Sequence, residues 1–110
     1  MSLIRGDIHW VNFPQRDPKG AEIEKTRPCV ILSLTSVNAV RRTVVVVPLT
    51  SSPAPAPPIA IAIASAGADS VAVCDQVTAV DKRRLKNKTG HVSVDDLREI
   101  EQSVRLVLGL

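Results

Sequence analysis

Thr43 to Val47 is a threonine followed by four valines, and it is the strongest β-strand signal in the sequence. β-Branched side chains pack well on a pleated sheet and lose rotamer freedom in a helix, so this run predicts a strand. Pro28 to Leu34 is almost entirely apolar, which predicts a second strand that is buried on both faces or lies in a tight barrel.

Three further segments have strand character. Residues 8–13 are β-branched and aromatic, residues 59–63 alternate isoleucine with alanine, and residues 70–77 form another short apolar run. The alternation of the first segment fails at Trp10–Val11, which indicates a bulge or a strand bent around a barrel. The residues between the predicted strands at 28–34 and 43–47 are interpreted as a plain connector.

The C-terminal part combines a basic segment with a helix. Residues 81–91 hold five Lys or Arg against one acidic residue, which is typical of a solvated sheet edge with a short strand ending near Gly90, or of a surface that contacts phosphates. From Ser93 as N-cap to Gly109, the pattern predicts an amphipathic helix. Its apolar stripe comprises Leu97, Ile100, Val104, Val107 and Leu108. Five or six strands followed by one helix predict a mainly β fold, a small barrel or curled sheet with a C-terminal helix.

Length and composition set the broad class. The 110 residues, 45% of them apolar, fit one domain spanning residues 1–110 with its own core. The net charge of +3 is compatible with an anionic partner. Cys29 and Cys74 lie in apolar runs, which indicates buried thiols, and no metal site is predicted. No run reaches the ~18 apolar residues of a membrane span and no leader is recognised, so a cytoplasmic protein is expected.

A candidate site surrounds Glu24–Pro28, at the threshold of a predicted strand. A proline pushes the residue before it toward extended geometry, so Arg27 leaves the chain in a defined direction that suits a phosphate or a carboxylate. In a simple antiparallel meander, Arg27 and Thr50 lie at the same end of the sheet. Arginine can stabilise developing charge and threonine can orient a substrate. If that substrate is RNA, its own 2′-hydroxyl can be the nucleophile, which fits a site with no obvious nucleophile of its own. The alternative is an ordinary solvated loop end.

Four segments, in this order and spacing, resemble the MazF/PemK toxins of bacterial toxin–antitoxin modules. They are RGDIHWVNF at 5–13, GAEIEKTRP at 20–28, VPLTSS at 47–52 and CDQVTAVDKRRL at 74–85. The resemblance implies an SH3-like barrel with a C-terminal helix, usually a homodimer. It also implies an endoribonuclease, or mRNA interferase, that cuts single-stranded RNA at short specific sequences, inhibits translation and growth, and needs no metal or other cofactor. The implied partner is an acidic, MazE-like antitoxin whose C-terminal tail lies across the toxin.

The resemblance also implies roles for single residues. Arg27 matches the family's catalytic arginine and Thr50 its catalytic threonine. The implied reaction is attack of the 2′-hydroxyl on the adjacent phosphorus, giving a cyclic phosphate and a 5′-hydroxyl. Because arginine stays protonated, Arg27 is assigned to charge stabilisation, and Glu22 is a candidate base. The RNA-binding or auxiliary residues are expected to be Glu22, Lys25, Thr26, Ser51, Asp75 and Gln76.

Two positions depart from the pattern of some plasmid-encoded members. Val73 stands where those members carry an arginine, and Ala21 stands where they carry a histidine. The mechanism that uses that arginine, aspartate and histidine set therefore does not transfer, whereas the Arg27 and Thr50 pair does.

Two other functions stay open. A gyrase-poison-like toxin on the same fold would bind a topoisomerase through a specialised C-terminal segment, whereas this chain ends in the apolar sequence Val107–Leu110. An SH3-like binding module without catalysis is the second alternative. One Trp, one Phe and no Tyr argue against a proline-recognition groove and against a base-stacking platform.

Overall fold

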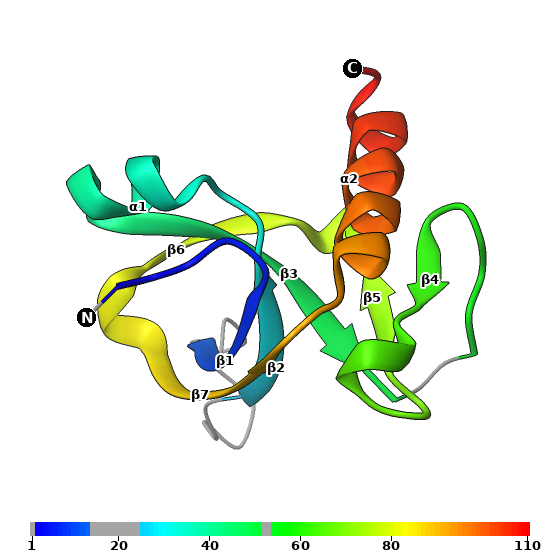
Figure 1. Ribbon diagram of the computed structural model, residues 1–110, viewed down its shortest axis with the longest axis horizontal. Helices are drawn as coiled ribbons and strands as arrows, with labels where there is room; N and C mark the ends of the chain where they lie inside the picture. The colour runs from blue at the N-terminus through cyan, green and yellow to red at the C-terminus, as the bar shows by residue number, and fades with distance from the viewer. Residues whose placement is uncertain (1, 14–24, 52–53) are drawn as a thin grey trace, which may run out of the picture.

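The computed structural model describes residues 2–13, 25–51 and 54–110 (Figure 1). Within these ranges the chain forms seven strands, two α-helices and three single-turn 3₁₀ helices. The strands are β1 (Asp7–Phe13), β2 (Lys25–Ile31), β3 (Thr43–Thr50), β4 (Ala60–Ala62), β5 (Val71–Val73), β6 (Thr78–Asp81) and β7 (Leu85–His91). The helices are α1 (Thr35–Val40), α2 (Val94–Leu108), η1 (Ala64–Ala66), η2 (Cys74–Gln76) and η3 (Lys82–Arg84).

The seven strands form one antiparallel sheet that curls on itself. Hydrogen-bonded neighbours follow the order β4, β5, β3, β2, β1 and β7, and β6 also pairs with β3. β6 and β7 thus pair with different strands, β3 and β1, yet they are joined by η3 alone. The sheet must bend to bring these two strands together. No ladder between β6 and β7 is present in the described part of the chain, so the sheet is curled but not closed. The predicted mainly β fold with a C-terminal helix is confirmed.

The apolar residues of β2 and β3 are buried on both faces of the sheet, as was predicted for the run that begins at Pro28. Alternate residues of the two strands enter two different apolar clusters. The cluster inside the curl holds Val11, Cys29, Ile31, Val44, Val46 and Val80. The cluster on the other face holds Ile8, Val30, Val47 and Leu49, and it also includes Ile100 and Val104 of α2. Figure 1 shows α2 standing beside β5 and β4, where it covers this second cluster.

α2 begins and ends where the sequence predicted. The Ser93 hydroxyl accepts a hydrogen bond from Asp96 N at 3.1 Å, and Gly109 ends the helix in the left-handed region with φ of 73°. Of the predicted apolar stripe, Ile100 and Val104 are buried, but Leu108 is exposed because the last turn extends beyond the sheet. In the described part of the chain, no helix is long and apolar enough to span a membrane.

Several predicted boundaries were wrong. The second strand starts three residues early, at Lys25, and ends at Ile31. The connector that follows contains α1, a helix organised by the buried side chain of Asn38. The strand predicted at 59–63 is shortened to β4. The irregularity predicted at Trp10–Val11 is found only in the pairing of β1 with β7, where the extra residues belong to β7. β1 pairs with β2 without interruption.

The strand predicted at residues 70–77 is also interrupted. Leu49 of β3 pairs with Ala72, whereas Val46 pairs with Thr78. The three steps from Leu49 to Val46 on β3 therefore correspond to six steps from Ala72 to Thr78, on the segment that runs from β5 to β6. The helix η2 lies within this longer segment. As a result, Asp75 and Gln76 lie on a 3₁₀ turn rather than on a strand, and both are exposed.

Candidate active site

A hollow lies where the β2–β3 ladder ends, and Pro28 is the first residue of β2 beyond the last pair. Leu32 N donates to Val45 O at 2.8 Å. In an antiparallel ladder, every second residue directs its N–H to the same neighbouring strand, so the nitrogen of Pro28 faces β3. Proline has no N–H to donate. The observed ladder accordingly ends at the pair Cys29 and Pro48, and it does not reach the next position, where Pro28 would pair with Leu49.

The hollow has a volume of about 440 Å³. This is within the range of roughly 300–1,000 Å³ that is typical of small-molecule sites. Its walls come from the first residues of β2, the end of β3, one residue of β1 and the residue before β5. They are Trp10, Lys25, Thr26, Arg27, Pro28, Leu49, Thr50, Ser51 and Ser70. Five of the eight predicted site residues, namely Arg27, Thr50, Lys25, Thr26 and Ser51, therefore border one hollow.

Arg27 and Thr50 both border this hollow, one from β2 and the other from β3. If the β2–β3 register is continued by two residues past Cys29 and Pro48, Arg27 falls opposite Thr50. Both side chains are partly exposed, so both are accessible to a ligand. The convergence that the simple meander predicted is therefore observed, although the full strand order is not that of a meander.

The guanidinium of Arg27 also acts on the neighbouring thiol. Cys29 is two residues along β2 and therefore on the same face, and its thiol donates to Arg27 O at 3.7 Å. Burial raises the pKa of Cys29 to about 12, and the positive charge of Arg27 opposes this rise. The thiol next to the hollow is therefore protonated at neutral pH and is not a nucleophile.

Two of the three remaining predicted site residues lie elsewhere. Asp75 and Gln76 do not border the hollow, and η2, which carries them, packs against α2. Glu22, the candidate base, lies outside the described residues, as does Glu24. Among the residues that are described, no three His, Cys, Asp or Glu side chains are grouped to hold a metal ion.

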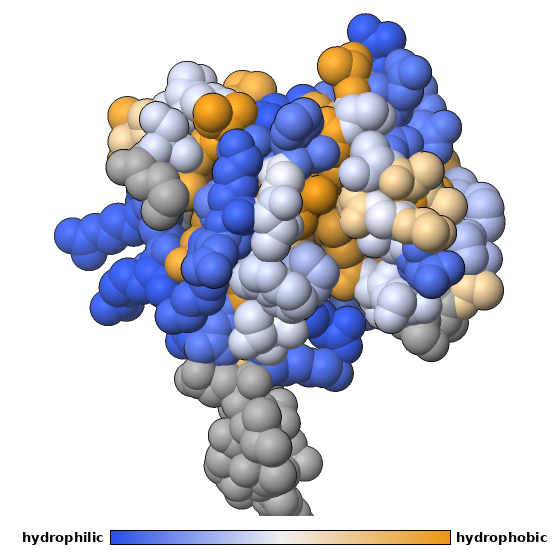
Figure 2. Space-filling model, turned by 60° about the horizontal axis from the view of Figure 1, so that its bottom comes forward, coloured by the Kyte–Doolittle hydropathy of each residue, from blue (hydrophilic) through white to orange (hydrophobic). Residues whose placement is uncertain are grey.

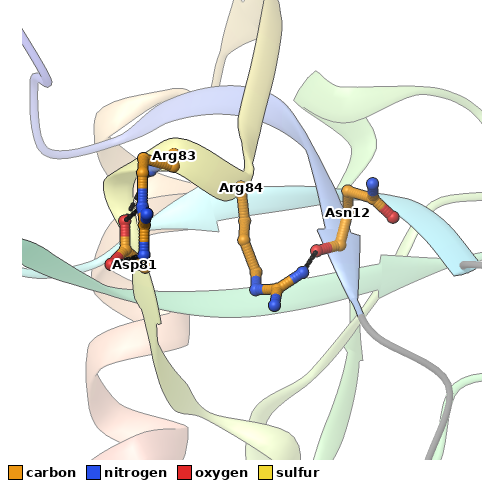
Figure 3. A network of polar contacts seen from close by, with 4 residues as sticks. All are labelled: Asn12, Asp81, Arg83 and Arg84. Atoms are coloured by element: carbon orange, nitrogen blue, oxygen red, sulfur yellow. Dashed lines mark hydrogen bonds and ion pairs between the residues drawn. The ribbon is translucent and has the colours of Figure 1, made fainter.

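The basic segment follows the edge formed by β6, η3 and β7. Arg83 pairs with Asp81, with Nε 3.1 Å from Oδ1, and Arg84 Nη1 donates to Asn12 O at 3.5 Å (Figure 3). The hydrogen bonds from Arg83 hold the pKa of the Asp81 carboxyl below its ordinary value. The predicted short strand is present as β7, and its Lys86 and Lys88 are exposed. Figure 2 shows long hydrophilic side chains projecting from the left side of that view.

Trp10 is a wall residue that the sequence interpretation missed. The scarcity of aromatic residues argued against a stacking surface, but the one tryptophan in the chain borders the same hollow as Arg27. A usable signal was present, because Trp10 breaks the alternation of its strand.

Comparison with known proteins identifies the family. The sequence profile described as "PemK-like, MazF-like toxin of type II toxin-antitoxin system" matches residues 4–108. The chain belongs to this family of toxins.

Solved structures have the same fold. MazF in a MazE–MazF crystal structure from Deinococcus radiodurans superposes with a TM-score of 0.83 at 26% identity, covering 100% of this chain and 98% of that one. A mycobacterial structure described as an endoribonuclease in complex with its cognate antitoxin gives a TM-score of 0.77 at 21% identity, covering 99% and 97%. The Mycobacterium tuberculosis toxin MazF-mt6 gives 0.62 at 19% identity, covering 92% and 97%.

Proposed function

We propose that this toxin is a sequence-specific endoribonuclease that cleaves single-stranded messenger RNA in the cytoplasm without a metal ion. The observation that carries the proposal is the position of Arg27 and Thr50 at one accessible hollow. A phosphate between them would meet a fixed positive charge and a hydroxyl group. These groups can orient and stabilise a reaction whose nucleophile, the 2′-hydroxyl, belongs to the substrate itself.

In the proposed reaction, the 2′-oxygen forms a bond to the adjacent phosphorus and the bond from phosphorus to the 5′-oxygen breaks. The products are a 2′,3′-cyclic phosphate and a 5′-hydroxyl. Arg27 stabilises the negative charge that builds on the phosphate oxygens, because its guanidinium stays protonated throughout. Thr50 donates a hydrogen bond that orients the phosphate, and Lys25 adds positive charge at the rim. Glu22 is the proposed base that accepts the 2′-hydroxyl proton.

The test is cleavage of one long RNA in excess EDTA, with both new ends mapped. We expect discrete cuts at a short repeated sequence, a cyclic phosphate on one fragment and a 5′-hydroxyl on the other. Intact RNA, in the presence of folded protein, would contradict the proposal. Inhibition of DNA supercoiling without RNA cleavage would instead favour the topoisomerase-binding alternative, and RNA binding without turnover would favour a non-catalytic module.

We further propose an acidic antitoxin as partner. Two of the similar structures are described as complexes with MazE or with a cognate antitoxin, and this chain is basic overall. The exposed cations of the β6–β7 edge, together with Lys25, offer contacts to acidic side chains. A charge-led interface weakens as salt screens it, so we expect the affinity to fall between low and high ionic strength. An affinity that does not change with salt would contradict this contact surface.

A homodimer is the proposed functional form. Leu106 and Ile59 are exposed apolar residues, and Leu106 borders an apolar hollow between α2 and the segment Pro57–Pro58. Light scattering after size exclusion tests this proposal, with twice the mass of one chain as the expected result. A monomer at concentrations where the toxin is active would contradict it.

A further inference from the structure

We infer that Trp10, Pro28 and Leu49 form a stacking subsite for a nucleobase, next to the phosphate-binding position of Arg27. The inference rests on the proposed function for the identity of the ligand, a single strand of RNA. It adds how that strand is held, which neither the family nor the paired Arg27 and Thr50 specify.

The three residues form a row across three neighbouring strands. Trp10 of β1 pairs directly with Pro28 of β2. Continuing the β2–β3 register by one residue past Cys29 and Pro48 places Leu49 beside Pro28. The row therefore lies on the face of the sheet that carries Ile8 and Val30, and all three residues border the hollow. Arg27 and Thr50 belong by register to the opposite face, with Cys29, and they border the same hollow where the β2–β3 ladder ends. It provides an apolar floor, while Lys25, Thr26, Thr50, Ser51 and Ser70 supply a polar rim.

Burial falls along the row toward Trp10. Leu49 is buried, Pro28 is half-buried, and Trp10 is 39% exposed. Ile8, two residues earlier on the same face of β1, is buried in the cluster that α2 covers. Trp10 lies beyond that cover, so a large flat ring borders solvent next to the hollow. The one phenylalanine, Phe13, packs instead against the cluster inside the curl.

This arrangement fits the two parts of a nucleotide. A base is flat and stacks on an aromatic ring, and a phosphate is an anion that pairs with a cation. The hollow offers an indole and a proline ring for the first, and Arg27 with Lys25 for the second. Because every base has a π-face, stacking on Trp10 supports binding of the strand without selecting the base. The sequence preference of the enzyme must then come from other residues.

The chain offers a direct optical test. It contains one tryptophan and no tyrosine, so its intrinsic fluorescence reports on Trp10 alone. The probe is a short mixed-sequence 2′-O-methyl oligoribonucleotide, which lacks the attacking hydroxyl and stays intact. We expect saturable quenching of Trp10 with the same midpoint as binding measured by fluorescence anisotropy of a labelled probe. An abasic oligonucleotide of equal length should bind through its phosphates with little quenching.

Substitutions of Trp10 distinguish stacking on an aromatic ring from simple apolar contact. Trp10→Ala should weaken binding of the 2′-O-methyl probe about tenfold or more, because a stacked base is lost. Trp10→Phe should retain most of the affinity, whereas Trp10→Leu, apolar but without a π-face, should behave like the alanine variant. Val40→Ala, at an exposed apolar residue of α1, is the matched control and should bind like the parent protein.

The outcomes of these experiments test the stacking subsite and the ribonuclease proposal independently of each other. Quenching without RNA cleavage by the parent protein would support the subsite and contradict the enzyme. Cleavage with an unquenched Trp10 and an unaffected Trp10→Ala variant would overturn the subsite and leave the enzyme intact. Quenching by an acidic peptide, but by no oligonucleotide, would overturn it as well, because the row would then be a surface for a protein partner.

Discussion

Pro28 pairs with Trp10 across β1 and β2, and its ring nitrogen, which carries no hydrogen, faces β3. One residue thus supports the indole on one side and ends the sheet ladder on the other. No further pair follows between β2 and β3 in this direction, and Arg27 and Thr50 border the hollow at this end of the ladder. We infer that the missing backbone donor shapes the hollow as well as the side chains do.

Pro28→Val tests this origin of the hollow. Valine restores an N–H and suits a strand, so the ladder should extend to Leu49 and narrow the hollow. We expect RNA cleavage to fall by about tenfold or more, since small displacements of a catalytic group are costly, while thermal stability stays the same or rises. A new slowly exchanging amide at residue 28 is the structural readout. Pro55→Val, at an exposed proline outside this hollow, is the control. Full activity of Pro28→Val would contradict the argument.

Arg27→Ala should lower kcat by about 10²–10³, the usual loss when a donor to a developing oxyanion is removed. Arg27→Lys keeps the charge but loses the planar fork, so it should fall between the alanine variant and the parent protein. Single-turnover cleavage of a fixed RNA at saturating enzyme is the measurement. Arg41→Ala, at an exposed arginine that does not border the hollow, should cleave normally. Equal losses at both arginines would point to general charge rather than to a site.

Thr50→Val replaces the hydroxyl with a methyl group of similar size. If the hydroxyl donates to the phosphate, cleavage should fall about 10- to 100-fold, the usual weight of a hydrogen bond to a charged group. Thr50→Ser should recover most of the rate because it restores the donor. Thr43→Val, at the exposed start of the same strand, serves as the control. A serine variant as slow as the valine variant would assign Thr50 to packing.

The sequence alone predicted much of this architecture, for identifiable reasons. Two-sided burial of β2 follows from its continuous apolar run, and both ends of α2 follow from Ser93 and Gly109. The convergence of Arg27 and Thr50 needed only that β2 and β3 be antiparallel neighbours.

What the sequence did not predict depends on contacts between distant segments. η2 arises where the partner of β3 carries three extra residues, which no local pattern marks. α1 is a short helix with a polar residue inward, so it lacks an apolar stripe. Trp10 was undervalued because composition counts aromatic residues without placing them.

Asn38 is the buried residue that holds α1 in place. Its amide nitrogen donates to Leu3 O at 2.9 Å and to Ser33 O at 3.1 Å, and its oxygen accepts from the Ser33 hydroxyl. Asn38→Leu leaves these partners unsatisfied, so we expect a loss of about 2–4 kcal/mol in the free energy of unfolding. Urea titration gives the value, and Ser36→Ala on the exposed side of α1 should change it little. Cleavage per folded molecule should be unaffected, because α1 does not border the hollow.

Cys29 gives the fold a defined sensitivity to alkaline pH. Burial raises the pKa of its thiol from an ordinary 9.0 to about 12. Between these values the unfolded chain loses the thiol proton while the folded chain keeps it, so folding is favoured by protonation and stability falls as the pH rises. The decline should approach about 1.4 kcal/mol per pH unit above pH 9. Urea titrations from pH 8 to about 10.5 measure this slope in the free energy of unfolding.

Cys29→Val removes the titrating group and keeps an apolar side chain at the site. The variant should therefore show a shallower alkaline slope than the parent protein, by up to the same 1.4 kcal/mol per unit or so. Cys74→Val is the matched comparison, because burial raises the pKa of that thiol too; the hydrogen bond with Ser103 opposes the rise, and the negative charge of Asp75 adds to it. In each valine variant, the free energy of unfolding should therefore fall less steeply with rising pH than in the parent protein. If Cys29→Val kept the full parental slope, the Cys29 thiolate would have to be accommodated in the folded chain, next to the guanidinium of Arg27.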